Sequence, residues 1–234
     1  MEFITGPGGV IDTWLRRGAA GFRLDVADEL PDEFIEKVRA AVKRVSPEKF
    51  LLGEVWEDAT TKFGFNKRRT YLLGKGLDSV MNYPFKNAVL DFVKGKPAEQ
   101  AMTEILTICE HYPAPAMDTA LNFLSTHDTE RALTVIADEP ANGRGREWQS
   151  GRCVTGEAYE EGLLRLRMAY AIIYTLPGVP CLYYGDEIAM QGYRDPFNRA
   201  FFRWDAHEQR LRPVLAQLAQ LRHTCEAFRT GQLR

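Results

Sequence analysis

Residues 21–26, Gly-Phe-Arg-Leu-Asp-Val, alternate apolar with charged side chains and follow small residues, which is typical of a short buried strand. Pro31 then opens a helix at a favoured first position. Four apolar side chains recur on one face of this helix: Phe34, Val38, Val42 and Val45. A second buried strand follows at residues 50–56, Phe-Leu-Leu-Gly-Glu-Val-Trp. Strand, helix and strand in this order predict a right-handed βαβ unit with parallel strands.

The same alternation of strands and helices continues along the whole chain. Periodicity predicts further strands at residues 77–83, 121–125 and 179–184. It predicts the remaining helices at residues 10–17, 85–93, 98–111, from about 129–131, 157–176 and 208–229. A polar, glycine-bearing stretch at 138–156 is predicted to be an excursion loop. We therefore expect an α/β fold built on a parallel sheet.

Composition and charge exclude several classes of protein. The 234 residues are 45% hydrophobic and 26% charged, which suits a globular chain with a sizeable core. Thirty Lys and Arg against 32 Asp and Glu leave a net charge of −2, so nothing indicates a nucleic acid or membrane partner. The four cysteines form no C-x-x-C pair, and we expect no metal and no disulfide framework. The start of the sequence lacks the features of a signal peptide, which favours a cytoplasmic location.

The polar residues at the predicted strand ends point to chemistry on carbohydrates. No G-x-G-x-x-G or P-loop motif follows a strand, so a (β/α) barrel is favoured over a nucleotide-binding sheet and no cofactor is expected. Asp25, Glu54 and Asp128 each follow a strand, where parallel strands place their ends on one mouth. Cleavage of an acetal needs such a set: an acid for the leaving oxygen and a carboxylate for the oxocarbenium-like centre. Asp25 alternates with Arg23, so both side chains should point the same way.

Each of these residues also has a simpler interpretation. An Asp after a strand is often the cap of the next helix, and we assign that role to Asp28. For Trp56, stacking on a sugar ring and packing in the core are equally well supported. Tyr83 is closer to a core residue. Asp186 and Glu187 are expected to anchor the loop after the last strand rather than to react.

Four segments together resemble the α-amylase family of glycoside hydrolases. Residues 21–27 look like its nucleophile strand, 52–56 like its acid/base strand, 123–128 like its third carboxylate motif and 178–187 like its last barrel strand. The resemblance implies that Asp25 is the nucleophile, Glu54 the general acid/base and Asp128 the transition-state stabiliser. It implies a retaining mechanism through a covalent glycosyl-enzyme, with an α-glucan oligosaccharide as substrate.

The same resemblance implies further substrate-binding residues. Arg23 and His127 would orient the nucleophile and the bound glucose. Residues 195–199, Asp-Pro-Phe-Asn-Arg, with Trp204 are similar to a segment of the neopullulanase, cyclomaltodextrinase and maltogenic amylase branch. That similarity favours a role for Asp195 and Arg199 in binding sugar hydroxyls over a plain surface ion pair. The preference for α-1,4 or α-1,6 bonds and for hydrolysis or transglycosylation stays open.

The chain matches only part of the family's design. The family barrel has eight strands with the nucleophile on the fourth, so residues 1–234 would form one domain, a partial TIM barrel of about strands four to eight. The first three strands, the inserted domain that usually holds Ca²⁺ and the C-terminal β-sandwich would be missing. Five strands cannot close a barrel, so we expect a homo-oligomer that covers the exposed barrel face.

These departures leave two alternatives to a working α-glucan hydrolase. One is a catalytically inactive fragment or remnant of such an enzyme. The other, more distant, is a Schiff-base or phosphate-binding barrel, which would want a lysine inside a strand or a glycine-rich loop after the late strands, and the sequence has neither.

Overall fold

The computed structural model describes residues 2–205, 209–231 and 233. The chain divides into two compact units, the first formed by residues 1–84 and 107–121 and the second by residues 85–106 and 122–234. No helix among the described residues combines the length and the apolar character needed to cross a membrane.

The first unit is built on a small parallel sheet. Its strands β1 (Gly21–Leu24), β2 (Phe50–Gly53) and β5 (Ser79–Val80) are adjacent in that order. The register pairs Gly21 with Phe50 and Leu52 with Ser79, and both pairings are parallel. This confirms the βαβ unit that the sequence predicts. All three strands are shorter than predicted, and β1 and β2 stop directly before Asp25 and Glu54.

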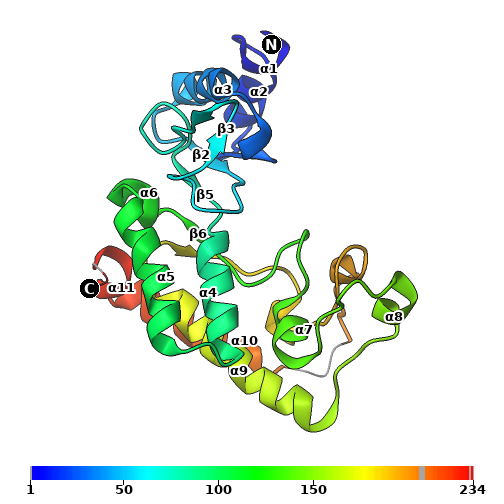
Figure 1. The fold of residues 1–234 in the computed structure, drawn as a ribbon. Coiled ribbons are helices and arrows are strands. Elements are labelled where there is room, and N and C mark those ends of the chain that lie inside the picture. The colour runs from blue at the N-terminus through cyan, green and yellow to red at the C-terminus, as the bar shows by residue number, and fades with distance from the viewer. Residues whose placement is uncertain (1, 206–208, 232, 234) are drawn as a thin grey trace. The chain divides into compact units, whose positions relative to one another are not determined.

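Helices cover this sheet and close the unit's core. They are α1 (Glu2–Thr5), α2 (Val10–Arg16), η1 (Ala27–Glu29), α3 (Asp32–Val45), the end of α5 (Ala98–His111) and α6 (Ala114–Asp118). A hairpin of β3 (Phe63–Gly64) and β4 (Lys67–Arg68) lies between β2 and β5 in the chain. The helices α2 and α3 pack side by side (Figure 1). The buried face of α3 differs slightly from the prediction, because Phe34 and Val45 are only partly buried while Ile35 is buried.

Gly53 shows how closely the sheet is packed. A Cβ atom at this position would lie 2.2 Å from Cδ1 of Leu77 and 3.2 Å from Cβ of Ala27. Any side chain would therefore displace the neighbouring segments. The glycine directly before Glu54 thus allows the chain to pass through the core just before the strand-end carboxylate.

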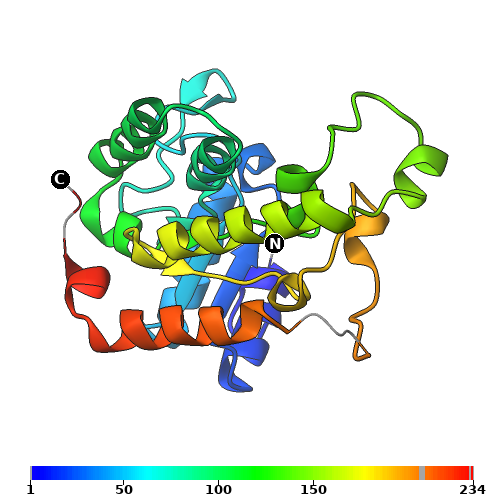
Figure 2. The ribbon, with the colours of Figure 1, turned by 90° about the horizontal axis from the view of Figure 1, so that it is seen from below.

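The second unit is mostly helical. Its elements are the greater part of α4 (Tyr83–Val93), the first part of α5, α7 (Ala132–Ala137), α8 (Arg146–Ser150), α9 (Gly156–Thr175), η2 (Asp186–Ile188), η3 (Phe197–Arg199), α10 (Leu211–Thr224) and α11 (Ala227–Thr230). The two-residue strands β6 (Leu121–Asn122) and β7 (Val179–Pro180) pair with each other. Helix α9 contacts both α7 and α10 (Figure 2).

Two contacts explain this packing of α9. A Cβ atom on Gly162 would lie 2.5 Å from Cβ of Ala137, so only glycine lets α9 approach α7 so closely. At the other end, Arg222 of α10 donates to the carbonyl oxygens of Tyr174 at 2.8 Å and Leu176 at 3.0 Å. These carbonyls end α9 and have no partner within the helix, so the guanidinium both satisfies them and binds the two helices together.

One loop prediction and two helix predictions differ from the structure. The segment 138–156 was predicted as loop but contains α8. The helix expected from 129–131 begins at Ala132, because residues 126–129 form a turn held by threonine hydroxyls. The closing helix is interrupted, with α10 ending at Thr224 and α11 starting at Ala227, and its predicted start at Glu208 lies outside the described residues.

Candidate active site

The first group of candidate residues follows β1. Arg23 and Asp25 point the same way, as strand alternation predicts, and Nη1 of Arg23 lies 2.5 Å from Oδ1 of Asp25. The Asp25 side chain remains 72% exposed. A carboxylate that is both anchored by a cation and open to solvent is well placed to meet a ligand.

Glu54, which follows β2, is in the opposite situation, because it is only 2% exposed. Its Oε2 lies 2.8 Å from Nη2 of Arg23 and accepts the backbone N–H of Val26 at 3.0 Å. Its Oε1 accepts the indole Nε1–H of Trp56 at 3.0 Å and faces the Tyr83 hydroxyl at 3.4 Å. Both carboxylate oxygens are therefore fixed in direction. Arg23 contacts Asp25 and Glu54 at once.

The backbone between these carboxylates bends sharply at Val26. Its φ of 40° and ψ of 48° place it in the left-handed region, which a β-branched residue seldom adopts. This turn directs the Val26 N–H to Glu54 and starts η1. Strain at such a position is typical of functional sites. The sequence carries no signal for it, since valine normally predicts the strand to continue.

Trp56 and Tyr83 stack on each other. Their ring centroids are 4.6 Å apart with an interplanar angle of 13°. Tyr83 is 2% exposed, in line with the core role predicted for it, whereas Trp56 is 44% exposed. Trp56 therefore fits both predicted roles, because one part of its indole packs on a core ring and another part is exposed to a ligand.

The cap role predicted for Asp28 is wrong. Helix α3 starts after Pro31 without any side-chain cap. Asp28 instead forms an ion pair with Lys62 at 3.2 Å, and its carbonyl oxygen accepts a hydrogen bond from Arg69. Asp28 lies within η1 itself, and Pro31 takes the N-cap position of α3, so Asp28 is too early in the chain to cap that helix.

The second group of candidate residues lies in the second unit. Nε2 of His127 is 3.0 Å from Oδ2 of Asp128, and Nη2 of Arg199 is 3.2 Å from Oδ1 of Asp128. Nε of Arg199 also lies 2.9 Å from Oδ1 of Asp195. The structure thus joins the four predicted residues of this unit into one chain of polar contacts, with both oxygens of Asp128 engaged.

A buried network supports the loop after β7. Asp186 is 2% exposed, accepts a hydrogen bond from the Tyr170 hydroxyl at 2.5 Å and lies 3.4 Å from Nη1 of Arg131. Burial raises the pKa of Asp186 to about 6, while the bonds to Tyr170 and the charge of Arg131 work against that rise. Glu187 accepts the backbone N–H of Gly185 at 2.7 Å. Both acids thus anchor this loop, as predicted.

Arg131 is a residue that the sequence reasoning missed. It is fully buried, its Nη1 donates to the carbonyl oxygen of Tyr184 at 2.7 Å, and its guanidinium lies 4.8 Å from the ring centroids of Tyr183 and Tyr184. A buried arginine needs such partners to offset its loss of hydration. Only the tertiary fold reveals them, because the partners lie more than 50 residues away in the chain.

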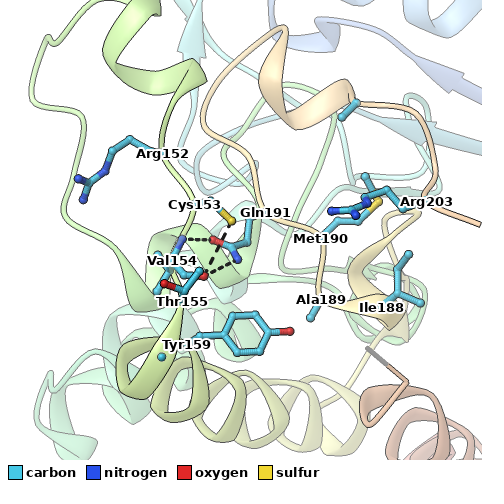
Figure 3. A pocket seen from close by; sticks show the side chains of 12 residues that line it. Arg152, Cys153, Val154, Thr155, Tyr159, Ile188, Ala189, Met190, Gln191 and Arg203 are labelled. Atoms are coloured by element: carbon cyan, nitrogen blue, oxygen red, sulfur yellow. Dashed lines mark hydrogen bonds between the residues drawn. The ribbon is translucent and has the colours of Figure 1, made fainter. Parts of the chain in front are cut away.

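A separate pocket of about 530 Å³ lies in the second unit (Figure 3). Its lining residues are Arg152, Cys153, Val154, Thr155, Gly156, Tyr159, Ile188, Ala189, Met190, Gln191, Ala200 and Arg203. Figure 3 shows Gln191 reaching across to Val154, whose N–H and carbonyl oxygen it binds at 2.7 and 3.0 Å. None of the predicted site residues lines this pocket. No group of three His, Cys, Asp or Glu residues suited to a metal occurs in the described part of the chain.

Comparison with known proteins gives one consistent result. Residues 6–223 match the family model described as Alpha amylase, catalytic domain. The chain is 32% identical over 252 residues to the amylopullulanase of Thermoanaerobacter thermohydrosulfuricus, covering 98% of this chain and 16% of that protein. It is 33% identical over 223 residues to a cyclomaltodextrinase of a Bacillus species, covering 93% of this chain and 34% of that one. The chain therefore spans at most about a third of these relatives.

Solved structures agree with the sequence relatives. The cyclic α-maltosyl-(1→6)-maltose hydrolase of Arthrobacter globiformis, in complex with that sugar, superposes with a TM-score of 0.78 at 26% identity. The match covers 95% of this chain and 44% of that enzyme. A cyclomaltodextrinase superposes with a TM-score of 0.77 at 32% identity, covering 94% and 33%.

Proposed function

This chain belongs to the α-amylase catalytic domain family, whose solved members are TIM-barrel enzymes, and we propose that it supplies the catalytic carboxylates of a retaining glycoside hydrolase acting on α-glucans. The observation that carries this proposal is the bridge made by Arg23. One guanidinium contacts both the exposed Asp25 and the buried Glu54. A single guanidinium spans only carboxylates that lie a few ångströms apart, as a two-carboxylate retaining mechanism requires.

The environments of the two carboxylates suit different roles. Asp25 is the nucleophile, because its carboxylate is exposed to an incoming sugar and is held in direction by Arg23. Glu54 is the general acid/base, held by donors on both oxygens so that its geometry is fixed before substrate binds. In the first step Glu54 protonates the glycosidic oxygen while Asp25 attacks the anomeric carbon. In the second step Glu54 takes a proton from water, which releases the sugar from Asp25.

The remaining candidate residues bind the sugar. Asp128, held by His127 and Arg199, is assigned to the hydroxyls next to the reacting carbon. Asp195 and Arg199 extend that polar surface. Trp56 offers an exposed indole face of the kind that stacks on a sugar ring. Cyclodextrins, pullulan and related α-glucans are the substrate class, in keeping with the names of the relatives.

We also propose that the chain corresponds to about strands four to eight of the family barrel, as one catalytic half-domain. The parallel strands β1, β2 and β5 and the pair β6–β7 support this assignment. A half barrel leaves one sheet face to be covered by a second copy. Light scattering on the full chain should then give at least twice the mass of one chain. A stable monomer that binds no dye for exposed apolar surface contradicts this arrangement.

Reducing-sugar release from β-cyclodextrin and pullulan tests the catalytic proposal. We expect turnover in the full chain and a loss of about a thousandfold or more in Asp25→Asn and Glu54→Gln. The matched control is Asp91→Asn, an exposed acid of α4 whose only ion pair is to Lys96 at 3.6 Å among the described residues, and it should leave the rate unchanged. A fluorinated α-glucosyl fluoride should add one sugar to the Asp25 peptide in a mass spectrum.

The outcomes separate the hydrolase from the inactive fragment. Turnover that Asp25→Asn abolishes supports the hydrolase and rules out the inactive fragment. Turnover that persists in Asp25→Asn contradicts the assignment of the nucleophile. Absence of turnover in the unmodified chain contradicts independent activity and supports the inactive fragment.

A further inference from the structure

The turn that carries Asp128 has little regular structure of its own. It lies between β6 and α7, and two of its backbone N–H groups are bound by hydroxyls of the same turn. The Asp128 N–H donates to Oγ1 of Thr126 at 3.1 Å, and the Thr126 N–H donates to Oγ1 of Thr129 at 3.2 Å. These local bonds shape the turn. They do not attach it to the rest of the unit.

Asn198 makes that attachment from a distant part of the chain. It is fully buried in η3, next to Arg199. Its Nδ2 lies 2.7 Å from the carbonyl oxygen of His127 and 2.8 Å from that of Thr129, with the carbonyl of Thr126 at 3.4 Å. An amide nitrogen carries two hydrogens, so the two shorter contacts use both of them. One side chain thus holds the backbone on both sides of Asp128.

The surroundings also fix which way round the amide lies. Rotating the Asn198 amide by 180° would direct its oxygen at three carbonyl oxygens and lose both hydrogen bonds. In the orientation observed, Oδ1 is buried and has no hydrogen-bond partner among the described residues. Burying an oxygen in this way is unfavourable. It is tolerated here because the nitrogen of the same group satisfies two buried carbonyls.

From this arrangement we infer that Asn198 is a positioning residue for Asp128, holding the backbone of the 126–129 turn so that the carboxylate faces its sugar. Asn198 and Arg199 act as a pair, since Asn198 fixes the backbone and Arg199 contacts the Asp128 carboxylate at 3.2 Å. The role of Asp128 rests on the proposed function. The attachment of the turn is a separate claim and is tested separately.

Amide hydrogen exchange in the full chain measures how firmly the 126–129 turn is attached, and it does not require enzymatic activity. The first variant is Asn198→Ala. The second is Asn198→Asp, which replaces the Nδ2 donor by a carboxylate oxygen in a side chain of the same size. The matched control is Asn122→Ala, because Asn122 is also fully buried in this unit and its Nδ2 donates to a backbone carbonyl, that of Pro177, at 2.6 Å. All are compared with the unmodified chain.

We expect the Thr126 and Asp128 amides to exchange about tenfold faster or more in Asn198→Ala, while core amides of α9 keep their protection. In Asn122→Ala the same two amides should keep their rates relative to α9. Equal acceleration of the turn and of α9 in Asn198→Ala, or the same pattern in both variants, would show that Asn198 serves only general stability and would overturn the inference.

Steady-state kinetics then measure how the attachment of the turn affects the reaction. Where the unmodified chain turns over β-cyclodextrin, Asn198→Ala should lower kcat about tenfold or more with a smaller change in KM, and Asn122→Ala should keep kcat. An unchanged kcat in Asn198→Ala despite a loosened turn overturns the positioning role. If the unmodified chain has no turnover but Asn198→Ala still loosens the turn, the proposed function is contradicted and the attachment is supported. The two failures are therefore distinguishable.

Discussion

The guanidinium nitrogen Nη2 of Arg23 lies 2.8 Å from Oε2 of Glu54, and this contact joins the ends of two neighbouring strands. Because Glu54 is buried, its carboxyl group depends on that guanidinium and on a few hydrogen-bond donors for polar partners. We expect Arg23→Met to lower the free energy of unfolding by about 2–4 kcal/mol, because it leaves the buried Glu54 carboxyl group without its guanidinium partner. Urea unfolding of the full chain measures this.

A double mutant identifies the cause of that loss. Glu54→Gln removes the acid that Arg23 contacts, so it should recover part of the stability when it is added to Arg23→Met. Arg16→Met in α2 is the control, because Arg16 is exposed, and it should change stability by no more than about 0.5 kcal/mol. Strictly additive effects of the two substitutions at Arg23 and Glu54 would contradict a direct interaction.

Trp56 is expected to contribute separately through its indole N–H and its ring. Trp56→Phe keeps a ring to stack on Tyr83 but removes the hydrogen bond to Glu54, which should cost about 1–2 kcal/mol. Trp56→Ala loses the stacking as well and should cost more. Trp14→Phe, an exposed tryptophan of α2, serves as control in thermal unfolding. Trp56→Phe as stable as the original chain would mean that the bond to Glu54 adds nothing.

Asp78 should make the first unit sensitive to acid. It accepts hydrogen bonds from Lys43 at 2.8 Å, Arg39 at 2.7 Å and the Leu51 N–H at 2.8 Å, which tie α3 to the sheet. Burial alone would raise the pKa of Asp78, but these bonds outweigh it and hold the pKa below its usual value. The unfolded chain therefore binds this proton first as the pH falls, so the stabilisation is present at neutral pH and is lost below about pH 4.

Asp78→Asn tests this dependence. At pH 7 it should lower the free energy of unfolding by about 2–3 kcal/mol, and the difference from the original chain should shrink below about pH 4. Asp91→Asn, with a half-exposed carboxylate, should show a far smaller difference. A difference that stays constant from pH 7 to pH 3 would rule out the ionised form of Asp78 as its source.

Local patterns in the sequence predict those parts of the fold and site that depend on neighbouring residues. The βαβ unit follows from apolar periodicity, and the Arg23–Asp25 contact follows from strand alternation, because both involve residues close in the chain. The core position of Tyr83 agrees with the general tendency of aromatic side chains to be buried.

The features that sequence reasoning missed depend on distant partners. Asn198 acts on a turn some 70 residues away, and Arg131 on a loop more than 50 residues away, so neither leaves a local pattern. Val26 even contradicts its local preference, since a β-branched residue adopts a left-handed conformation there. The hydrogen bond from its N–H to Glu54 helps to offset that strain. The cap role predicted for Asp28 fails because Asp28 belongs to η1, and Pro31 takes the N-cap position of α3.

Asp186 should give the second unit the opposite dependence on pH. Its pKa is raised to about 6 by burial, so the folded chain takes up this proton before the unfolded chain does as the pH falls. The contribution of Asp186 to the free energy of unfolding should therefore rise by about 3 kcal/mol between pH 7.5 and pH 4. The measurement is the difference in unfolding free energy between the original chain and Asp186→Asn across this range.

The difference between the two chains is needed because acids such as Asp78 stop stabilising the fold at the low end of this pH range. Their loss would hide the gain from Asp186 if the original chain were measured alone. Asp186→Asn keeps a polar group of similar size beside Tyr170 and Arg131 but cannot titrate. Tyr170→Phe is a second test. Loss of the hydrogen bond from Tyr170 should raise the pKa of Asp186 further, so the change in stability should occur at higher pH. Parallel stability curves for the original chain and Asp186→Asn would show that Asp186 keeps the same charge throughout.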